Sequence, residues 1–315
     1  MITKDDIVAA RERIRPHVHV TPLLRSTRLG DAAGGIDLWL KCESLQRTGS
    51  FKARGALNAV MQLSTGERER GVVTVSAGNH AQALAWASAM VGAHCVTVMP
   101  EGSSKTKIKA TEGYGAKVEI VGGERVRAFE RAQEIAAQGR VMVHPFEDPR
   151  VASGQGTVAL EVLEQTRDVD AVVVPIGGGG LISGISTAIK AAWPKTRVIG
   201  VEPSGAATMR ASLDAGKPMT ISPKTIADGL AAPMVGAMTL ETTRRNVDDV
   251  VLVNDDEILA ALRDVLAYAR LVIEPAAAAS VAALITGKIP VSRGARVVAV
   301  LSGGNVDLDR LKTLL

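Results

Sequence analysis

Short apolar runs rich in β-branched residues recur along the chain, each followed by a polar or glycine turn and a longer Ala- and Leu-rich segment with helical spacing. This alternation predicts strands at 37–42, 72–75, 94–98, 117–121, 141–143, 171–175, 197–201, 249–253 and 296–301. The predicted helices include 4–14, 53–63, 79–91, 105–113, 124–138, 154–166, 181–192, 255–270 and 275–286. Strands that alternate with helices in this way favour an α/β fold with mostly parallel sheets.

Nine strands are too many for one small sheet, so we expect two sheets and two α/β lobes with a cleft between them. The best break in the alternation is the turn HPFEDP at 144–149, which contains two prolines. The alanine run at 276–279 has helical surroundings, so we expect it to pack closely rather than to link domains.

The composition fits a globular protein: 315 residues, of which 46% are hydrophobic and only 3% aromatic, predict a large core of aliphatic side chains. The net charge of +4 arises from interleaved acidic and basic residues, which gives no support to nucleic acid binding. Cys42 and Cys95 have neither metal-binding nor redox spacing, so both are expected to be buried thiols.

The first segment of the chain has charged residues with helical periodicity and a capping box from Thr3 to Asp6. This pattern predicts a helix rather than a signal peptide. No apolar run reaches the roughly 18 residues that a membrane-spanning helix needs, so we expect no membrane span and a cytoplasmic location.

The stretch VVVPIGGGGLISGI at 172–185 is the most specific local pattern. A buried strand, a turn of glycines and a helix follow one another there, and this order directs backbone N–H groups and a helix dipole toward an anion such as phosphate. No Gly-Lys-Ser/Thr and no G-x-G-x-x-G follows, which disfavours ATP and NAD. The competing interpretation is that the glycines only allow tight packing of strand on helix.

Lys52 lies in TGSFKARGA at 48–56. A single lysine is usually a solvated charge, but a lysine whose pKa is lowered can form a Schiff base with pyridoxal phosphate (PLP). Together with a phosphate-binding turn, that chemistry becomes a hypothesis for this chain.

Four motifs occur in order and resemble those of fold-type II PLP enzymes: SFKARGA, SAGNHAQ at 76–82, GGGGL at 177–181 and LSGGN at 301–305. Four further phrases are similar to serine/threonine dehydratases and serine racemases: HPFEDP, SGQGT at 153–157, TIADGLA at 225–231 and IEPAAA at 273–278. The resemblance covers nearly the whole chain.

The resemblance implies a two-lobed, tryptophan synthase β-like architecture of mostly parallel, twisted sheets flanked by helices. Residues 1–70 and 146–315 would form a large PLP-binding domain, and residues 71–145 a small domain that closes over the active site. A homodimer is also implied.

By resemblance, Lys52 would form the Schiff base with PLP and then remove the Cα proton of the substrate. Asn79 would bind the phenolic oxygen, Ser302 would face the pyridine nitrogen, and Phe51 would also contact the cofactor. The phosphate would lie on the backbone of Gly177, Gly178, Gly179, Gly180 and Leu181. Glu274 would lie near the ring, with capping of the helix that starts at Pro275 as the competing role.

The loop SAGNH would hold the substrate carboxylate through its N–H groups and the Ser76 hydroxyl. Its residues are Ser76, Ala77, Gly78, Asn79 and His80. An N-cap of the following helix is an alternative role for Ser76, and a satisfied polar side chain is expected for His80 rather than a catalytic base.

The implied activity is that of a threonine/serine ammonia-lyase, which converts threonine to 2-oxobutanoate or serine to pyruvate with release of ammonia. A serine hydroxyl at Ser302 cannot keep the pyridine nitrogen protonated, which favours prompt loss of a β leaving group. Phe146 is typical of the dehydratases, although plain core packing explains it equally well.

Three alternatives stay open: a serine racemase, a 3-hydroxyaspartate dehydratase and a non-catalytic protein that binds a phosphorylated metabolite. Ala77 stands where serine racemases have a second serine, and a methyl group cannot deliver a proton, so racemisation is disfavoured.

Relatives with a divalent-cation site have a glutamate, a backbone carbonyl and an aspartate where this chain has Glu202, Ala206 and Thr208. The missing carboxylate at Thr208 disfavours Mg²⁺ or Ca²⁺, so we assign no metal ligand. The nucleotide-binding residues of serine racemases are matched only in part, by Ser26, Thr27, Arg47 and Thr48, and no ATP site is inferred.

Overall fold

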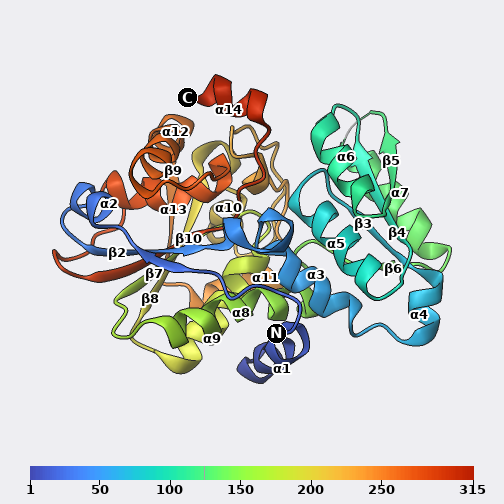
Figure 1. Ribbon diagram of the computed structural model, residues 1–315, viewed down its shortest axis with the longest axis horizontal. Coiled ribbons are helices and arrows are strands. Elements are labelled where there is room, and N and C mark those ends of the chain that lie inside the picture. Colours follow the sequence, from blue (N-terminus) through green and yellow to red (C-terminus); the bar gives the residue numbers. More distant parts are fainter. Residues whose placement is uncertain (124) are drawn as a thin grey trace.

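Two sheets organise the computed structural model, which describes residues 1–123 and 125–315 (Figure 1). The six-stranded sheet has the order β1-β2-β10-β7-β8-β9, and the four-stranded sheet has the order β5-β4-β3-β6. The first is built from Leu23–Arg25 (β1), Asp37–Cys42 (β2), Ala171–Pro175 (β7), Arg197–Pro203 (β8), Asp249–Val253 (β9) and Arg296–Leu301 (β10). The second is built from Val72–Val75 (β3), Cys95–Pro100 (β4), Lys117–Val121 (β5) and Val141–Met142 (β6). Every pairing is parallel except that of β1 with β2.

Helices cover both faces of each sheet (Figure 1). The α-helices are Lys4–Ile14 (α1), Thr27–Ala32 (α2), Lys52–Val60 (α3), Thr65–Arg70 (α4), Asn79–Met90 (α5), Lys105–Gly113 (α6), Arg125–Ala137 (α7), Pro149–Gln165 (α8), Gly180–Ala192 (α9), Thr208–Ala215 (α10), Ala237–Asn246 (α11), Asp255–Asp264 (α12), Pro275–Ile285 (α13) and Leu308–Leu314 (α14). Short 3₁₀ turns occupy Glu43–Leu45 (η1), Arg47–Gly49 (η2), Ser204–Ala206 (η3) and Asp228–Leu230 (η4), and a π turn (η5) occupies Val265–Ala269.

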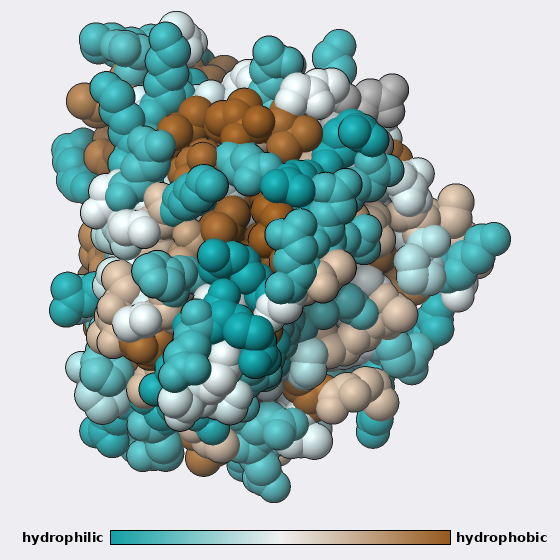
Figure 2. Space-filling model, turned by 90° about the vertical axis from the view of Figure 1, so that its right-hand side faces the viewer, coloured by the Kyte–Doolittle hydropathy of each residue, from teal (hydrophilic) through white to brown (hydrophobic). Residues whose placement is uncertain are grey.

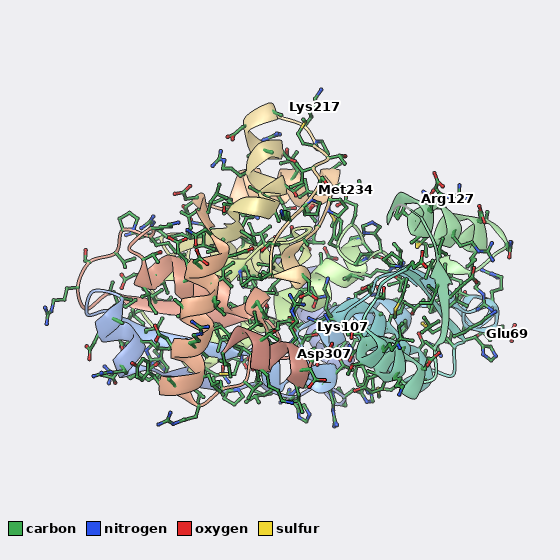
Figure 3. The ribbon with its side chains drawn as sticks, turned by 90° about the horizontal axis from the view of Figure 1, so that it is seen from above. Glu69, Lys107, Arg127, Lys217, Met234 and Asp307 are labelled. Atoms are coloured by element: carbon green, nitrogen blue, oxygen red, sulfur yellow. The ribbon has the colours of Figure 1, made fainter. Side chains whose placement is uncertain are left out.

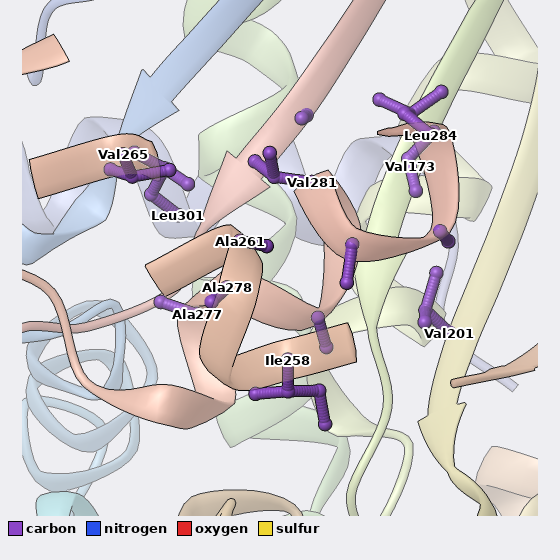
Figure 4. Packing of buried hydrophobic residues seen from close by; sticks show 14 of the residues in the cluster. Val173, Val201, Ile258, Ala261, Val265, Ala277, Ala278, Val281, Leu284 and Leu301 are labelled. Atoms are coloured by element: carbon purple, nitrogen blue, oxygen red, sulfur yellow. The ribbon is translucent and has the colours of Figure 1, made fainter. Parts of the chain in front are cut away.

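The strands of the larger sheet are apolar throughout because both of their faces are buried. Val173, Val201 and Leu301 point to the face covered by α12 and α13, as Figure 4 shows, whereas Val172 and Val298 point to the face covered by α8 and α9. The alanine run at 276–279 is fully buried in α13, which confirms close packing.

The four-stranded sheet follows the same rule with fewer strands. Val72 and Cys95 pack toward α3 and α5, and Val73 and Val96 pack toward α7. Figure 2 shows the outer face of this part of the molecule, where hydrophilic side chains cover most of the surface and hydrophobic residues form a larger group in the upper half and several smaller ones elsewhere. In the described part of the chain, no helix is both apolar enough and long enough to reach across a bilayer.

The predicted strands are confirmed with shifts of one or two residues at their ends. Strand β1 has no counterpart among the predictions because three residues on an antiparallel edge carry too little pattern. The capping box from Thr3 to Asp6 is present, and both cysteines are buried free thiols.

Three helix predictions are wrong in their extent. The helix predicted at 53–63 ends at Val60. The helix predicted at 154–166 starts earlier, because Asp148 caps it and Pro149 occupies its first turn, where a proline costs no hydrogen bond. The helix predicted at 255–270 ends at Asp264 and passes into a π turn that stops at Arg270, whose φ of 61° is left-handed. Position 124, the first residue of another predicted helix, lies outside the described residues, and α7 covers Arg125–Ala137.

Candidate active site

The sequence motifs meet at the carboxyl ends of parallel strands, which is where α/β folds bind ligands. The loop 76–80 follows β3, the glycine turn 177–180 follows β7, and the loop 302–305 follows β10. The first turn of α3 joins them, because the amide of Phe51 donates to the carbonyl of Ser302 at 3.1 Å. Lys52 and Ser302, far apart in sequence, are therefore brought close together.

Lys52 is the first residue of α3, and its side chain is half-buried. Its Nζ donates to the carbonyl oxygen of Pro145 at 2.8 Å and lies 5.2 Å from the centre of the Phe51 ring. Burial lowers the pKa of Lys52 to about 8, although the charge of Glu274 raises it. A neutral, nucleophilic amine is therefore accessible near physiological pH.

The glycine turn leads directly into α9. Gly179 has a φ of 91°, and the first intrahelical bond is made by the amide of Ser183 to the carbonyl of Gly179. The amides of Gly180 and Leu181 come before the residue that makes this first bond. They are therefore among the N–H groups at the start of a helix that have no acceptor within the helix and can donate to a bound anion. Gly177 and Gly178 are partly exposed, and the turn presents backbone rather than side chains to an anion.

Phe146 closes one side of this turn. A Cβ at Gly178 would overlap the Phe146 ring, and a Cβ at Gly180 would come within 3.1 Å of the Phe146 Cα. Since Phe146 follows Pro145, the contact also connects the glycine turn to the acceptor of Lys52. Phe146 thus packs against the candidate phosphate site.

A carboxamide and a carboxyl group form the other side of the site. Asn79 Nδ2 donates to Glu274 Oε1 at 2.7 Å. Glu274 is 3% exposed, and its pKa is raised to about 7 by burial and by the charge of Asp228, against the lowering effect of Lys107 and of the Asn79 hydrogen bond. Glu274 occupies the N-cap position of α13, as its competing role predicts, but its side chain makes no capping hydrogen bond.

The loop before α5 is arranged differently from the N-cap prediction. Gly78, not Ser76, is the N-cap of α5, and the Ser76 hydroxyl accepts from the amide of Gly78 at 3.3 Å. Residues 76–79 are partly exposed, so their polar groups can meet a substrate.

His80 is buried, and its Nε2 lies 3.1 Å from the carbonyl of Val143. Burial and the charge of Lys52 lower the pKa of His80 to about 3, although its hydrogen bond to the Val143 carbonyl raises it, so the ring is neutral. The prediction of a satisfied polar side chain is therefore met at Nε2 only, because Nδ1 is buried without a hydrogen-bond partner among the described residues.

The candidate cation residues serve a helix terminus instead. Glu202 is buried, and its two oxygens accept from the amides of Met209 (2.7 Å) and Arg210 (2.8 Å), which caps α10. Thr208 donates its hydroxyl to the carbonyl of Ala232. Within residues 1–123 and 125–315, no cluster of three or more His, Cys, Asp or Glu side chains is placed to hold a metal ion.

Sequence reasoning missed three groups at this site: the carbonyl of Pro145, the side chain of His144 and that of Asn305. His144 Nδ1 accepts from the amide of Glu147 at 2.9 Å and shapes the turn that carries Pro145. Asn305 Nδ2 donates to Asn79 Oδ1 at 2.8 Å. Asn305 belongs to the LSGGN motif, which was a usable signal for it, whereas a backbone acceptor leaves no signal in the sequence.

The residues fit a cofactor with an aldehyde and a phosphate. The Lys52 amine has a lowered pKa, the glycine turn has no room for a Cβ, and Asn79 supplies a carboxamide. Ser302 is 3% exposed, so a ring in contact with it would be shielded from water on that side.

The family model described as pyridoxal-phosphate dependent enzyme matches residues 14–303. The chain is 44% identical to the L-threonine ammonia-lyase of Thermotoga maritima, over 100% of this chain and 78% of that protein. It is 41% identical to the catabolic L-threonine dehydratase of Escherichia coli, over 98% of this chain and 95% of the other. The structure of maize serine racemase superposes with a TM-score of 0.94 at 37% identity, covering 99% of this chain and 96% of that one.

Proposed function

The chain belongs to the family of pyridoxal-phosphate dependent enzymes, and from this premise we propose that it is a threonine/serine ammonia-lyase. Its reaction would eliminate water from a 3-hydroxy amino acid to give a 2-amino-enoic acid, and hydrolysis of that product by water would yield a 2-oxo acid and ammonia. The observation that carries the proposal is the Lys52 amine of lowered pKa beside the glycine turn. The identities of 44% and 41% to an ammonia-lyase and a dehydratase support this choice of reaction.

When bound, PLP supplies an aldehyde that captures the amino group of the substrate and a ring that withdraws electrons from Cα. Lys52 would hold the cofactor covalently, the amides of the turn from Gly177 to Leu181 would hold its phosphate, and Asn79 would donate to its phenolic oxygen. Ser302 would face the ring nitrogen.

Lys52 would also perform the proton transfer. Once the substrate has displaced it, its neutral Nζ would take the proton from Cα, and the carbonyl of Pro145, 2.8 Å from Nζ, would hold the resulting ammonium ion. The amides of Ala77 and Asn79, together with the Ser76 hydroxyl, would orient the substrate carboxylate, because the amide of Ser76 already donates to the carbonyl of Val98 at 3.1 Å and that of Gly78 to the Ser76 hydroxyl. This assigns the binding of the carboxylate and the movement of the proton to different segments of the chain.

Parallel assays test the proposal against its rivals. Purified protein with PLP should release 2-oxobutanoate from threonine and pyruvate from serine, and Lys52→Ala should abolish both. Chiral analysis of serine should show little D-serine, because Ala77 offers no proton donor. D-serine without oxo acid would indicate the racemase. Oxo acid from 3-hydroxyaspartate alone would indicate the 3-hydroxyaspartate dehydratase, and no product from any of these substrates would indicate the non-catalytic binder.

Borohydride reduction followed by peptide mass spectrometry tests the attachment site independently of turnover. The reduced cofactor should be found on Lys52. A label on another lysine would contradict the assignment even if the activity is correct.

We also propose that residues 71–145 form a small domain that closes over the site of the large domain formed by 1–70 and 146–315. In support, the Ser104 hydroxyl donates to Asp307 at 2.7 Å and Lys107 Nζ donates to Asp228 at 2.7 Å (Figure 3). Small-angle X-ray scattering should show compaction when serine is added to Lys52→Ala protein loaded with PLP, which can bind serine without turning it over, and an unchanged radius of gyration would argue against closure.

A homodimer and a cytoplasmic location complete the proposal. Light scattering of the purified chain should give twice the monomer mass of 32.9 kDa. A monomer mass in active protein would refute the dimer.

A further inference from the structure

The side-chain amide of Asn79 is held from both ends by residues from distant parts of the chain. Asn305 Nδ2, in the loop after β10, donates to Asn79 Oδ1 at 2.8 Å. Asn79 Nδ2 in turn donates to Glu274 Oε1 at 2.7 Å, at the start of α13. A directed row of hydrogen bonds therefore runs from Asn305 through Asn79 to Glu274.

The direction of this row is fixed by a backbone carbonyl. Asn305 Nδ2 also donates to the carbonyl oxygen of Thr48 at 2.7 Å, and a carbonyl can only accept. Asn305 must therefore present its nitrogen on this side, and its second hydrogen must meet an acceptor on Asn79. Asn79 is forced to place Oδ1 toward Asn305 and Nδ2 toward Glu274.

Thr48 adopts an unusual backbone conformation at this contact. Its φ of 57° lies in the left-handed region, which a β-branched residue rarely enters. Strain of this kind persists only where the surrounding structure imposes it. The carbonyl that accepts from Asn305 therefore belongs to a residue whose strained backbone conformation is maintained by its surroundings.

Glu274 is confined at the other end. The amide of Glu274 donates to the carbonyl of Gly303 at 3.1 Å, and a Cβ at Gly303 would lie 2.5 Å from Glu274 Oε1 and 3.2 Å from Asn79 Nδ2. Glycine at 303 therefore leaves the space in which Asn79 and Glu274 meet. Glu274 Oε1 can accept whether or not the carboxyl group is protonated, so the row does not depend on its charge.

We propose that Asn305 is a positioning residue that holds the Asn79 carboxamide with an N–H free for the anionic oxygen of the bound cofactor. One hydrogen of Asn79 Nδ2 is used by Glu274, and the second remains for the phenolic oxygen of PLP. If the Asn79 carboxamide were flipped, its Oδ1 would face the anionic oxygen and repel it. This inference rests on the proposed use of PLP and adds a role for a residue that does not itself need to touch the cofactor.

Asn305→Asp tests the inference with the smallest change of shape. A carboxylate cannot donate, so it would repel both the Thr48 carbonyl and Asn79 Oδ1 and release the orientation of Asn79. We expect the dissociation constant for PLP, measured by fluorescence titration of cofactor-free protein, to rise about 10- to 100-fold, as for the loss of a hydrogen bond to a charged group. The absorption maximum of the bound cofactor should shift as well.

A double-mutant cycle separates positioning from a general structural effect. In an Asn79→Ala background, Asn305→Asp should change PLP affinity by less than twofold, because there is no carboxamide left to orient. Equal losses in both backgrounds would overturn the inference, as would wild-type affinity and absorption maximum in Asn305→Asp. Should Asn305→Asp fail to fold by circular dichroism, Asn305→Ala takes its place in the same cycle.

The control is Asn246→Asp, because Asn246 donates to Thr187 on a different helix and contacts neither Asn79 nor Glu274 within the described residues. It should leave PLP affinity unchanged. The cycle measures binding and not turnover, so a wild-type protein that binds PLP without releasing oxo acid would refute the proposed function and leave this inference standing.

Discussion

Replacing Arg54 with methionine removes a guanidinium group that lies, 1% exposed, between two buried carboxylates. Arg54 Nε and Nη2 each donate to Glu43 at 2.8 Å, and Nη1 donates to Glu161 at 2.6 Å. Lys41 Nζ donates to the other oxygen of Glu161 at 2.6 Å. The four side chains balance two positive and two negative charges beneath α3, the helix that begins with Lys52.

The cost of the substitution follows from what remains. Methionine fills the space of the side-chain stem but supplies no donor, so Lys41 is left to neutralise both Glu43 and Glu161 while bonding only Glu161. Removing one partner of a buried ion pair costs about 3–5 kcal/mol. Because Arg54 serves two carboxylates, we expect a loss of about 4–5 kcal/mol in the free energy of unfolding.

A second substitution tests this explanation. Glu43→Gln restores neutrality in the Arg54→Met background. The oxygen of the new carboxamide can still accept from the Thr21 hydroxyl, which lies 2.5 Å from Glu43 Oε1 in the wild-type protein. The double variant should therefore be more stable than Arg54→Met alone. Arg11→Met is the matched control, because Arg11 pairs with the exposed Glu164 and surface pairs are worth about 0–1 kcal/mol.

Urea unfolding followed by far-UV circular dichroism measures these differences. All proteins are compared without cofactor, since a ligand that binds only the folded state would mask part of the loss. A loss below about 1 kcal/mol for Arg54→Met, or a double variant no more stable than the single one, would refute the reasoning from uncompensated charge.

The rate at which cofactor-free protein takes up PLP should be half-maximal near pH 8 in stopped-flow absorbance, because only the neutral amine of Lys52, with its pKa of about 8, reacts. Glu274→Gln should move that midpoint to lower pH, since the Glu274 carboxylate raises the pKa of Lys52. Gly178→Ala should weaken PLP binding in a fluorescence titration by at least about tenfold, the loss of one hydrogen bond to a charged group, because the added Cβ would overlap the Phe146 ring and displace the turn. The free energy of unfolding should fall as the pH rises from 4.5 toward about 7, because the raised pKa values of buried Glu202 and Glu274 keep protons in the folded protein that the unfolded chain releases. Glu202→Gln should reduce this slope in urea titrations, and Glu274 should account for the part that remains.

Each of these outcomes has a control. A midpoint near pH 10.5, the ordinary value for lysine, would contradict desolvation of Lys52. Gly113→Ala, at a site in α6 where a Cβ would meet nothing within 4 Å, should leave PLP affinity unchanged. The exposed Glu12→Gln should leave the pH dependence of stability as it is, and an unchanged slope in Glu202→Gln would disprove the role of Glu202.

Most of the fold could be predicted because buried parallel strands have a strong and simple pattern. The run Ala171–Pro175 is apolar on both faces, and the helices on either side use those faces for separate cores. The limits of α12 could not be predicted in the same way. Its apolar periodicity continues past Asp264, and only the backbone shows that the chain changes to a π turn and stops at Arg270.

The candidate site also has a part that the sequence predicts and a part that it does not. Lys52, Asn79, the glycine turn and Ser302 lie in motifs, and the rule that carboxyl ends of parallel strands share one edge brings together the glycine turn after β7 and Ser302 after β10. Asn79 follows β3 of the other sheet, so its place beside them depends on the contact between the two sheets' loops and could not be predicted from that rule. The N-cap assigned to Ser76 failed because a serine before a helix can bind the loop as well as the helix, and the amide of Gly78 is the partner that it takes.

What the motifs cannot specify is which atom of one loop meets which atom of another. The partner of Lys52 is a backbone oxygen 93 residues away, and the partners of Asn79 are 195 and 226 residues away. These choices depend on separations of a few tenths of an ångström, as at Gly303, where a single methyl group would occupy the space that Glu274 Oε1 needs. A sequence indicates that such groups belong to one site, whereas the packing of backbone against side chain determines that the Asn79 carboxamide has one orientation.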